Sequence, residues 1–138
     1  MNPILSLRDA TVQDIQLELI RRRRFNDFYG ERVYELLLRH QGLWKSVIFD
    51  RLGQISAKRP GNLPMSGLIK LRDLEDNIWN VDHLYILTHT PEGARELSDV
   101  FEQAEMGAMP RVLDDPDEVD MALGTGGEVV GLLTVWWD

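Results

Sequence analysis

Cysteine is missing from this sequence of 138 residues. Disulfides, thiolate nucleophiles and thiolate metal sites are therefore excluded together. A chain without disulfides fits a reducing compartment, and we predict that the protein is cytoplasmic.

Long hydrophobic runs are missing as well. The longest uncharged apolar run, Val129 to Trp137, is far shorter than the roughly 20 residues of a membrane-spanning helix. The first residues, MNPILSLRDA, do not place a basic leader before an apolar core, as a secretory signal does. We therefore expect no association with a membrane.

Familiar catalytic and cofactor-binding motifs are also lacking. None of the five serines stands in a G-x-S-x-G sequence. The segment GTGGE, residues 124–128, lacks the G-x-G-x-x-G spacing and precedes an apolar stretch with strand character rather than a helix. It favours a hairpin turn at Gly126 and Gly127. We expect no cofactor, and whether the protein is an enzyme stays open.

Cations are scarce in the second half of the chain. Residues 1–72 contain 13 lysines and arginines against 7 aspartates and glutamates, whereas residues 73–138 contain 2 against 16, which gives the net charge of −8. Such asymmetry occurs in proteins that contact nucleic acid or an acidic partner surface. The simpler interpretation is that the two halves, or two copies of the chain, face each other.

The first part of the sequence has helical periodicity. Thr11 and Asp14 form a helix start signal before apolar residues at helical spacing. Two more helices are predicted, from about residue 26 to Gly42 and from Trp44 to Gly53. Residues 53–67 are rich in Gly, Pro and Ser, which is typical of a functional loop or a subdomain junction.

Alternating periodicity follows. Strands are predicted at residues 67–74 and 78–88, then a helix with Thr90 as its cap and Pro91 at its first position, then two strands within residues 117–137. We therefore predict a single α+β domain over residues 1–138, with a helical part (1–52), a loop (53–67) and a sheet part (68–138). Its three N-terminal helices precede a mostly antiparallel four-stranded sheet of order β-β-α-β-β, with one crossing helix, formed wholly after residue 66.

A run of four arginines, Arg21, Arg22, Arg23 and Arg24, ends the first predicted helix. Successive helical positions rotate by about 100°, so the four side chains point almost all the way round the axis and fit only a helix end. Cations are favoured there by the helix dipole. We predict a mainly structural role, with the run facing acidic groups of the second half or of a partner. The alternative is phosphate binding, reinforced by Lys58 and Arg59.

Two histidines, His83 and His89, are the candidates for a polar site. They share a face of one predicted strand but stand six residues apart, about 20 Å, so one metal ion cannot join them. Asp82 is expected on the opposite face, which leaves His83 without a local acid–base partner and places it in or beside the core. His89 ends the strand just before a helix, a position that commonly contacts ligands, so it is the better candidate for an active site.

The segment VLDDPDEVD, residues 112–120, contains five carboxylates. It lacks the spacing and the glycine of an EF-hand loop, so we predict a solvated acidic turn and no metal site.

The sequence ends with Trp136 and Trp137, which must point to opposite faces of a strand. One can enter the core while the other covers a second surface, and an exposed tryptophan is typical of an interface. An edge strand ending in two tryptophans favours pairing, so we expect a homo-oligomer, a homodimer above all, or another protein partner.

Three functions are compatible with these patterns. The first is a non-enzymatic interaction or regulatory protein that acts through protein–protein contacts. The second is a nucleic-acid-binding regulator that uses Arg21 to Arg24 with Lys58 and Arg59. The third is a small enzyme with its site near His89. The missing catalytic set and the charge asymmetry favour the first, and the acidic net charge disfavours nucleic acid.

Overall fold

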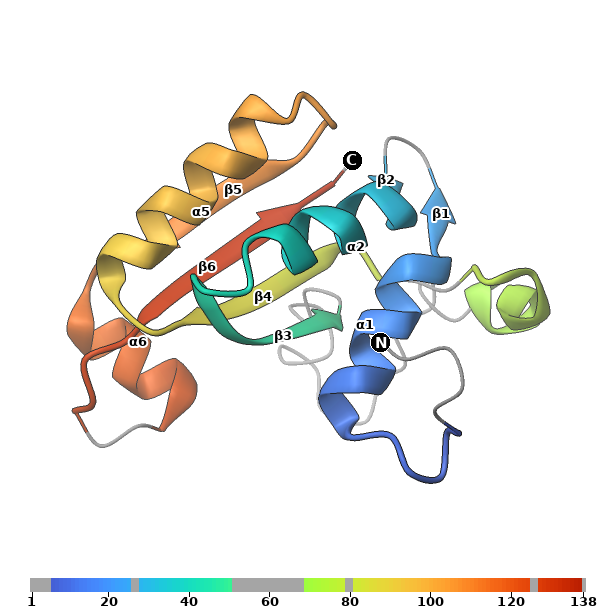
Figure 1. The fold of residues 1–138 in the computed structure, drawn as a ribbon, viewed down its shortest axis with the longest axis horizontal. Helices are drawn as coiled ribbons and strands as arrows, with labels where there is room; N and C mark the ends of the chain where they lie inside the picture. Colours follow the sequence, from blue (N-terminus) through green and yellow to red (C-terminus); the bar gives the residue numbers. More distant parts are fainter. Residues whose placement is uncertain (1–5, 26–27, 51–68, 79–80, 125–126, 138) are drawn as a thin grey trace.

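A computed structural model describes residues 6–25, 28–50, 69–78, 81–124 and 127–137, and the structure of the chain is discussed for these residues (Figure 1). The first helix is α1, Val12–Arg22. Thr11 Oγ1 accepts a hydrogen bond from the Asp14 N–H at 3.0 Å, and the Asp14 carboxylate accepts one from the Thr11 N–H at 3.0 Å. This reciprocal cap confirms the predicted helix start.

A tight antiparallel hairpin follows, formed by β1, Arg24–Phe25, and β2, Phe28–Tyr29. Helix α2, Gly30–Arg39, starts directly after it. A side chain at Gly30 would overlap the carbonyl oxygens of Ile20, Arg21 and Arg23. Glycine therefore allows α2 to begin against the end of α1.

Strand β3, Trp44–Asp50, occupies the segment where a third helix was predicted, and that prediction is wrong. Trp44, Val47 and Ile48 have helical spacing, but a register irregularity between Trp44 and Ser46 lets Trp44 and Val47, three residues apart, both be buried in a strand. Beyond the irregularity, Val47 and Phe49 are buried and Ile48 is exposed, as a strand requires. The sheet is therefore not formed wholly after residue 66.

The predicted loop at residues 53–67 lies outside the described residues. The strand expected at 67–74 is also wrong, because Ile69–Asp76 form the 3₁₀-helix η1. Local hydrogen bonds close this segment: the Asn77 N–H donates to the Leu74 carbonyl at 3.1 Å, and Asn77 adopts a φ of 64°. Asparagine tolerates this left-handed conformation.

The second half begins with strand β4, His83–Thr88, and helix α5, Pro91–Gln103. Thr90 Oγ1 accepts a hydrogen bond from the Gly93 N–H at 3.0 Å, which confirms the predicted cap. Strand β5, Met109–Leu113, was not predicted.

Helix α6, Pro116–Leu123, replaces the first of the two strands expected within residues 117–137, whereas β6, Gly131–Trp136, confirms the second. Asp115 caps α6, because its carboxylate accepts a hydrogen bond from the Asp117 N–H at 3.0 Å. Gly124 ends the helix with a φ of 62°. The predicted hairpin turn at Gly126 and Gly127 is therefore wrong; Gly126 lies outside the described residues.

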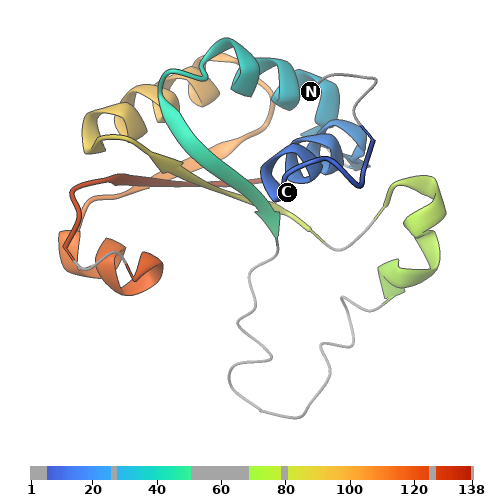
Figure 2. The same cartoon turned by 60° about the horizontal axis from the view of Figure 1, so that its bottom comes forward.

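The four longer strands form an antiparallel sheet in the order β3-β4-β6-β5. The α+β class and the antiparallel four-stranded sheet are confirmed, but two helices precede the sheet instead of three. Strand β6 lies inside the sheet, so the last strand is not the edge strand that was expected. Helices α1, α2 and α5 lie on one side of the sheet, and α6 lies on the other side near one end (Figure 2).

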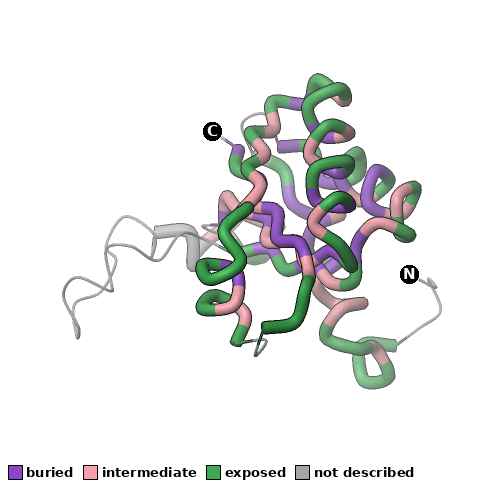
Figure 3. The backbone as a smooth tube through the Cα atoms, turned by 90° about the vertical axis from the view of Figure 1, so that its left-hand side faces the viewer, coloured by how far each residue is buried: buried purple, intermediate pink, exposed green. Residues whose placement is uncertain are grey.

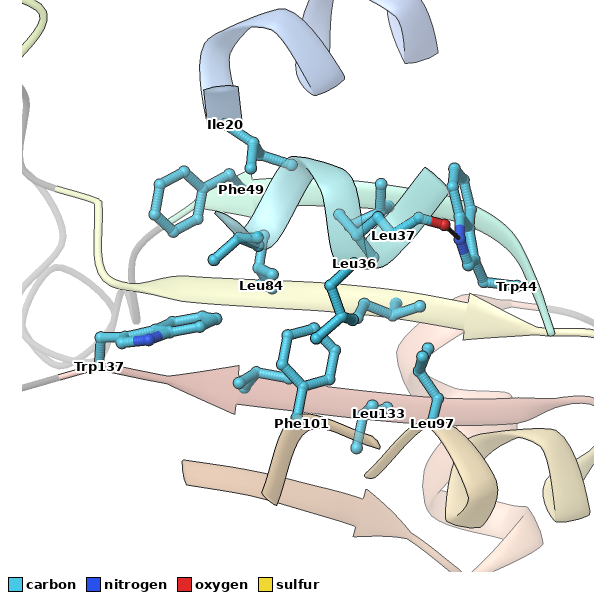
Figure 4. Packing of buried hydrophobic residues seen from close by; sticks show 14 of the residues in the cluster. Ile20, Leu36, Leu37, Trp44, Phe49, Leu84, Leu97, Phe101, Leu133 and Trp137 are labelled. Carbon is cyan, nitrogen blue, oxygen red and sulfur yellow. Dashed lines mark hydrogen bonds between the residues drawn. The ribbon is translucent and has the colours of Figure 1, made fainter. Parts of the chain in front are cut away.

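The hydrophobic core lies between the sheet and helices α1, α2 and α5 (Figures 3 and 4). Trp137 is 1% exposed, makes edge-to-face contacts with Phe28 and Phe101, and donates its indole N–H to the Met106 carbonyl at 3.2 Å. Trp44 closes the other end of the core by donating its indole N–H to the Leu37 carbonyl at 2.8 Å. The core thus combines residues from both sides of the 51–68 segment.

Glutamine side chains of α1 cover the outer edge of β3. The Gln13 amide accepts from the Val47 N–H at 2.8 Å and donates to the Val47 carbonyl at 2.9 Å. Gln16 accepts from the Phe49 N–H at 3.1 Å. Gln13 therefore pairs with the strand as a neighbouring strand would, and edge groups of Val47 and Phe49 have partners within the chain.

Candidate functional site

Two of the four arginines bind one carboxylate at the end of α1. Arg21 Nε and Arg22 Nε each donate to the Glu18 carboxylate at 2.9 Å. Hydrogen bonding from Arg21, followed by Arg22, lowers the pKa of Glu18 from 4.5 to about 2, against the opposing effect of burial. Both arginines therefore stabilise the C-terminal end of α1 through their bonds to Glu18.

Arg24 is the most exposed of the four, and it too has partners. Its guanidinium lies 4.8 Å from the centre of the Tyr29 ring and 3.7 Å from the Glu31 carboxylate. A pocket of about 420 Å³ lies beside it, lined by Arg21, Arg22, Arg24, Glu31, Asp76 and Asn77. Carboxylates thus offset much of the positive charge at this surface.

Arg23 points into the protein. Its side chain is buried, its Nε donates to the Val81 carbonyl at 2.9 Å, and its guanidinium lies 5.9 Å from the centre of the Phe49 ring. Burial lowers the pKa of Arg23 to about 10, and the charge of Asp82 opposes that decrease. The structure therefore divides the run into one core arginine and three surface arginines.

The ion-pair partners of the three surface arginines, Glu18 and Glu31, belong to the first half of the chain. The second half contributes Asp76, which lines the same pocket, and Asp82, whose charge acts on Arg23. That the run faces the second half or a partner stays a prediction. Lys58 and Arg59, the proposed reinforcements for phosphate binding, lie outside the described residues.

The side of the sheet opposite α1, α2 and α5 forms a second candidate surface, which we call the open face. It includes alternate strand positions that do not enter the core: Ile48 on β3, His83, Tyr85 and Leu87 on β4, Met109 and Arg111 on β5, and Leu132, Thr134 and Trp136 on β6. Ile48 is 43% exposed and Trp136 is 37% exposed. Helix α6 bounds this face at one end (Figure 2).

Three rings lie side by side at the other end of the open face. His83 pairs with Trp136 across the sheet, with ring centres 6.4 Å apart, and lies 5.9 Å from the centre of the Tyr85 ring. The His83 ring is nearly parallel to both, at 29° and 18°. We call Asp82, His83, Tyr85 and Trp136 the aromatic corner.

Asp82 holds the aromatic corner together. Its Oδ1 lies 2.8 Å from His83 Nδ1, and its Oδ2 accepts from the Trp136 indole N–H at 3.3 Å. The Trp137 N–H donates to the Asp82 backbone carbonyl at 3.1 Å. The expectation that Asp82 points away from His83 is wrong, because β4 begins at His83 and strand alternation does not extend to residue 82.

Two carboxylates act on Tyr85. Burial raises the pKa of Tyr85, and the charges of Asp50 and Asp82 raise it further. Asp50 lies opposite His83 in the register of β3 and β4.

An apolar groove of about 360 Å³ adjoins the corner. It is lined by Val12, Gln13, Gln16, Ser46, Val47, Ile48, Tyr85, Leu87, Leu123 and Leu132. Tyr85 belongs to both the groove and the corner, so the two form a continuous surface. A groove of this kind suits an apolar side chain, and the corner beside it supplies rings and a carboxylate.

The remaining polar candidates are dispersed. His89 is exposed in the turn between β4 and α5, and no described residue forms a hydrogen bond or an ion pair with it. The acidic segment 112–120 joins β5 to α6 and supplies the α6 cap. Within the described ranges, no three histidine, aspartate or glutamate side chains converge enough to hold a metal ion.

Sequence reasoning missed Ile48, Asp82 and Tyr85 as site residues. Alternation along β4 does place Tyr85 beside His83, but only the pairing of β4 with β3 and β6 brings Ile48 and Trp136 to the same face. Trp136 lies on the open face, and its neighbour Trp137 lies in the core.

No protein-family model matches the chain, and comparisons with curated proteins and with solved structures find no match. In the described part of the chain, no helix combines the length and the apolar character that crossing a membrane requires.

Proposed function

We propose that the protein is a non-enzymatic interaction module whose open face binds another protein. The observation that carries this proposal is the continuity of the aromatic corner with the apolar groove, which reaches from the open face to α1 at the edge of β3. Sheet faces without covering helices are normally polar, whereas Ile48, Met109 and Trp136 expose 37–43% of their area.

The composition of this surface favours a protein partner. Aromatic residues and methionine are enriched in protein interfaces, and a tryptophan surrounded by partly buried neighbours is typical of a binding hot spot. On the two adjacent strands, Trp136 lies opposite His83, which is partly buried, and Met109, which is 43% exposed.

Nucleic-acid binding has less support. Glu18 and Glu31 pair with the surface arginines, Arg23 is in the core, and the net charge is −8. The surface arginines are therefore already paired with carboxylates, and the net negative charge of the protein would repel a polyanion.

Site-specific photo-cross-linking tests the proposal. A photoreactive phenylalanine analogue is introduced at Trp136 and, as a matched control, at Tyr29, which is 43% exposed but belongs to the hairpin before α2. In cells of the source organism, we expect a discrete cross-linked protein from position 136 and none from position 29.

The captured protein is then purified and titrated by calorimetry. Ile48→Asp should weaken its binding at least about tenfold, because it places a charge in the apolar groove. Leu7→Asp, at a residue that is 69% exposed before α1, should leave binding unchanged. Equal cross-linking from both positions, or equal affinity of the two variants, would contradict the proposal.

A further inference from the structure

The carboxylate beside Trp136 indicates which kind of protein segment the open face would bind, and this inference rests on the proposed function. The indole N–H of Trp136 donates to the Asp82 carboxylate, which increases the electron density of the ring. The ring of tryptophan is the best aromatic surface for a cation, and a nearby carboxylate strengthens that preference.

Carboxylates also belong to the elements at both ends of the open face. Asp82 lies at the corner, and α6, which bounds the opposite end, carries Asp117 and Glu118 in its first turn. Four residues of β4, about 13 Å, separate the His83 and Leu87 positions between these ends. An extended segment of a few residues could span this distance.

Few cations of the described residues lie on the same face. Arg111 lies opposite Thr134 on β5, and Arg23 approaches Asp82 from the core side. Among the described residues, no guanidinium or ammonium group covers Trp136 or Tyr85. The Trp136 ring, 37% exposed and stacked with His83, therefore lies next to a carboxylate whose partners are His83 and the Trp136 indole.

We infer that the open face binds a basic, apolar segment of a protein partner, with a lysine or arginine lying over Trp136 and its charge beside Asp82. The apolar groove next to Tyr85 receives an aliphatic side chain of the same segment. The net charge of −8 adds long-range attraction for such a partner.

The inference is tested by NMR titration of the whole ¹⁵N-labelled protein with three probes. These are a blocked hexapeptide of alternating leucine and arginine, the same peptide with glutamate for arginine, and a single-stranded oligothymidylate. The basic peptide should shift the Trp136 indole N–H signal saturably, and 0.5 M salt should weaken this binding. The indole N–H signals of Trp44 and Trp137, which are bonded to buried carbonyls, are internal references that should move little.

Variants locate the effect. Trp136→Ala should weaken binding of the basic peptide about tenfold, and Asp82→Asn should weaken it severalfold. Tyr29→Leu removes an aromatic ring of similar exposure outside the open face and should change nothing. An unmoved Trp137 indole signal in Trp136→Ala shows that the fold is intact.

The outcomes separate this inference from the proposed function. Stronger binding of the acidic peptide, stronger binding of the oligothymidylate, or no shift with millimolar basic peptide would overturn the inference. If the acidic peptide binds more strongly, or if the basic peptide causes no shift, a specific cross-link at position 136 would still support a protein partner. Absence of that cross-link would contradict the proposed function itself.

Discussion

Replacing Glu18 by glutamine should show how strongly the arginine run depends on a buried carboxylate. The pKa of Glu18 is lowered from 4.5 to about 2, which corresponds to roughly 3 kcal/mol of favourable interaction in the folded state. Arg21 and Arg22 expose 38% and 52% of their side chains, so solvent screening reduces the expected loss in Glu18→Gln to roughly 1–2 kcal/mol at pH 7.

The pH dependence has a definite sign. A carboxylate whose pKa is lower in the folded state contributes its full stability above the unfolded-state pKa, here 4.5, and loses it as the pH falls toward about 2. The difference in unfolding free energy between the natural chain and Glu18→Gln should therefore be constant from pH 7 to about 5.5 and smaller at pH 3.5. Urea denaturation monitored by tryptophan fluorescence provides the measurement.

Glu31→Gln is the matched control. Glu31 also pairs with the run, but at 3.7–3.9 Å and with 49% of its side chain exposed, so its loss should cost at most about 0.5 kcal/mol. If both variants lose the same stability, or if the Glu18→Gln effect grows as the pH falls, the assigned role of Glu18 is wrong.

Further predictions concern the core, the sheet edge and cooperativity. Gly131→Ala should cost roughly 2–4 kcal/mol in urea denaturation, because a methyl group there would lie 2.5 Å from the Thr90 carbonyl oxygen, whereas Gly42→Ala has no atom within 4 Å and should change stability by less than about 0.5 kcal/mol. Gln13→Ala should speed hydrogen exchange of the Val47 amide about tenfold, and an unchanged rate would show that this bond does not protect the edge. Calorimetry should show one unfolding transition for the whole chain, and two separate transitions would disprove the single domain.

Local signals predicted some elements and misled on others. The capping box at Thr11 and the Thr90–Pro91 pair identified α1 and α5 because caps act within one helical turn. A capping residue followed by proline also occurs at the start of α6, where Asp115 precedes Pro116. There, Val119 and Met121 alternate with polar residues, so the segment was predicted as a strand.

Contacts between distant segments could not be predicted from the sequence. Gln13 and Val47 are 34 positions apart, Arg23 and Val81 are 58 apart, and Asp82 and Trp136 are 54 apart. Each of these contacts depends on the packing of whole elements, which periodicity does not specify. The aromatic corner also depends on this packing, because strand pairing brings together residues that share no sequence motif.

The glutamine-covered edge of β3 limits how copies of this chain could assemble. A sheet with two available edges can add strands on both sides and grow into a fibre. Here, bonds from Gln13 and Gln16 occupy one edge of the four-stranded sheet. Among the described strands of that sheet, intermolecular pairing is therefore confined to β5, which itself contains Pro110, a residue without an N–H. Pairing of β5 with β5 about a twofold axis consumes both remaining edges, and growth stops at two molecules. Polymerisation would first require the N-terminal helix to release β3.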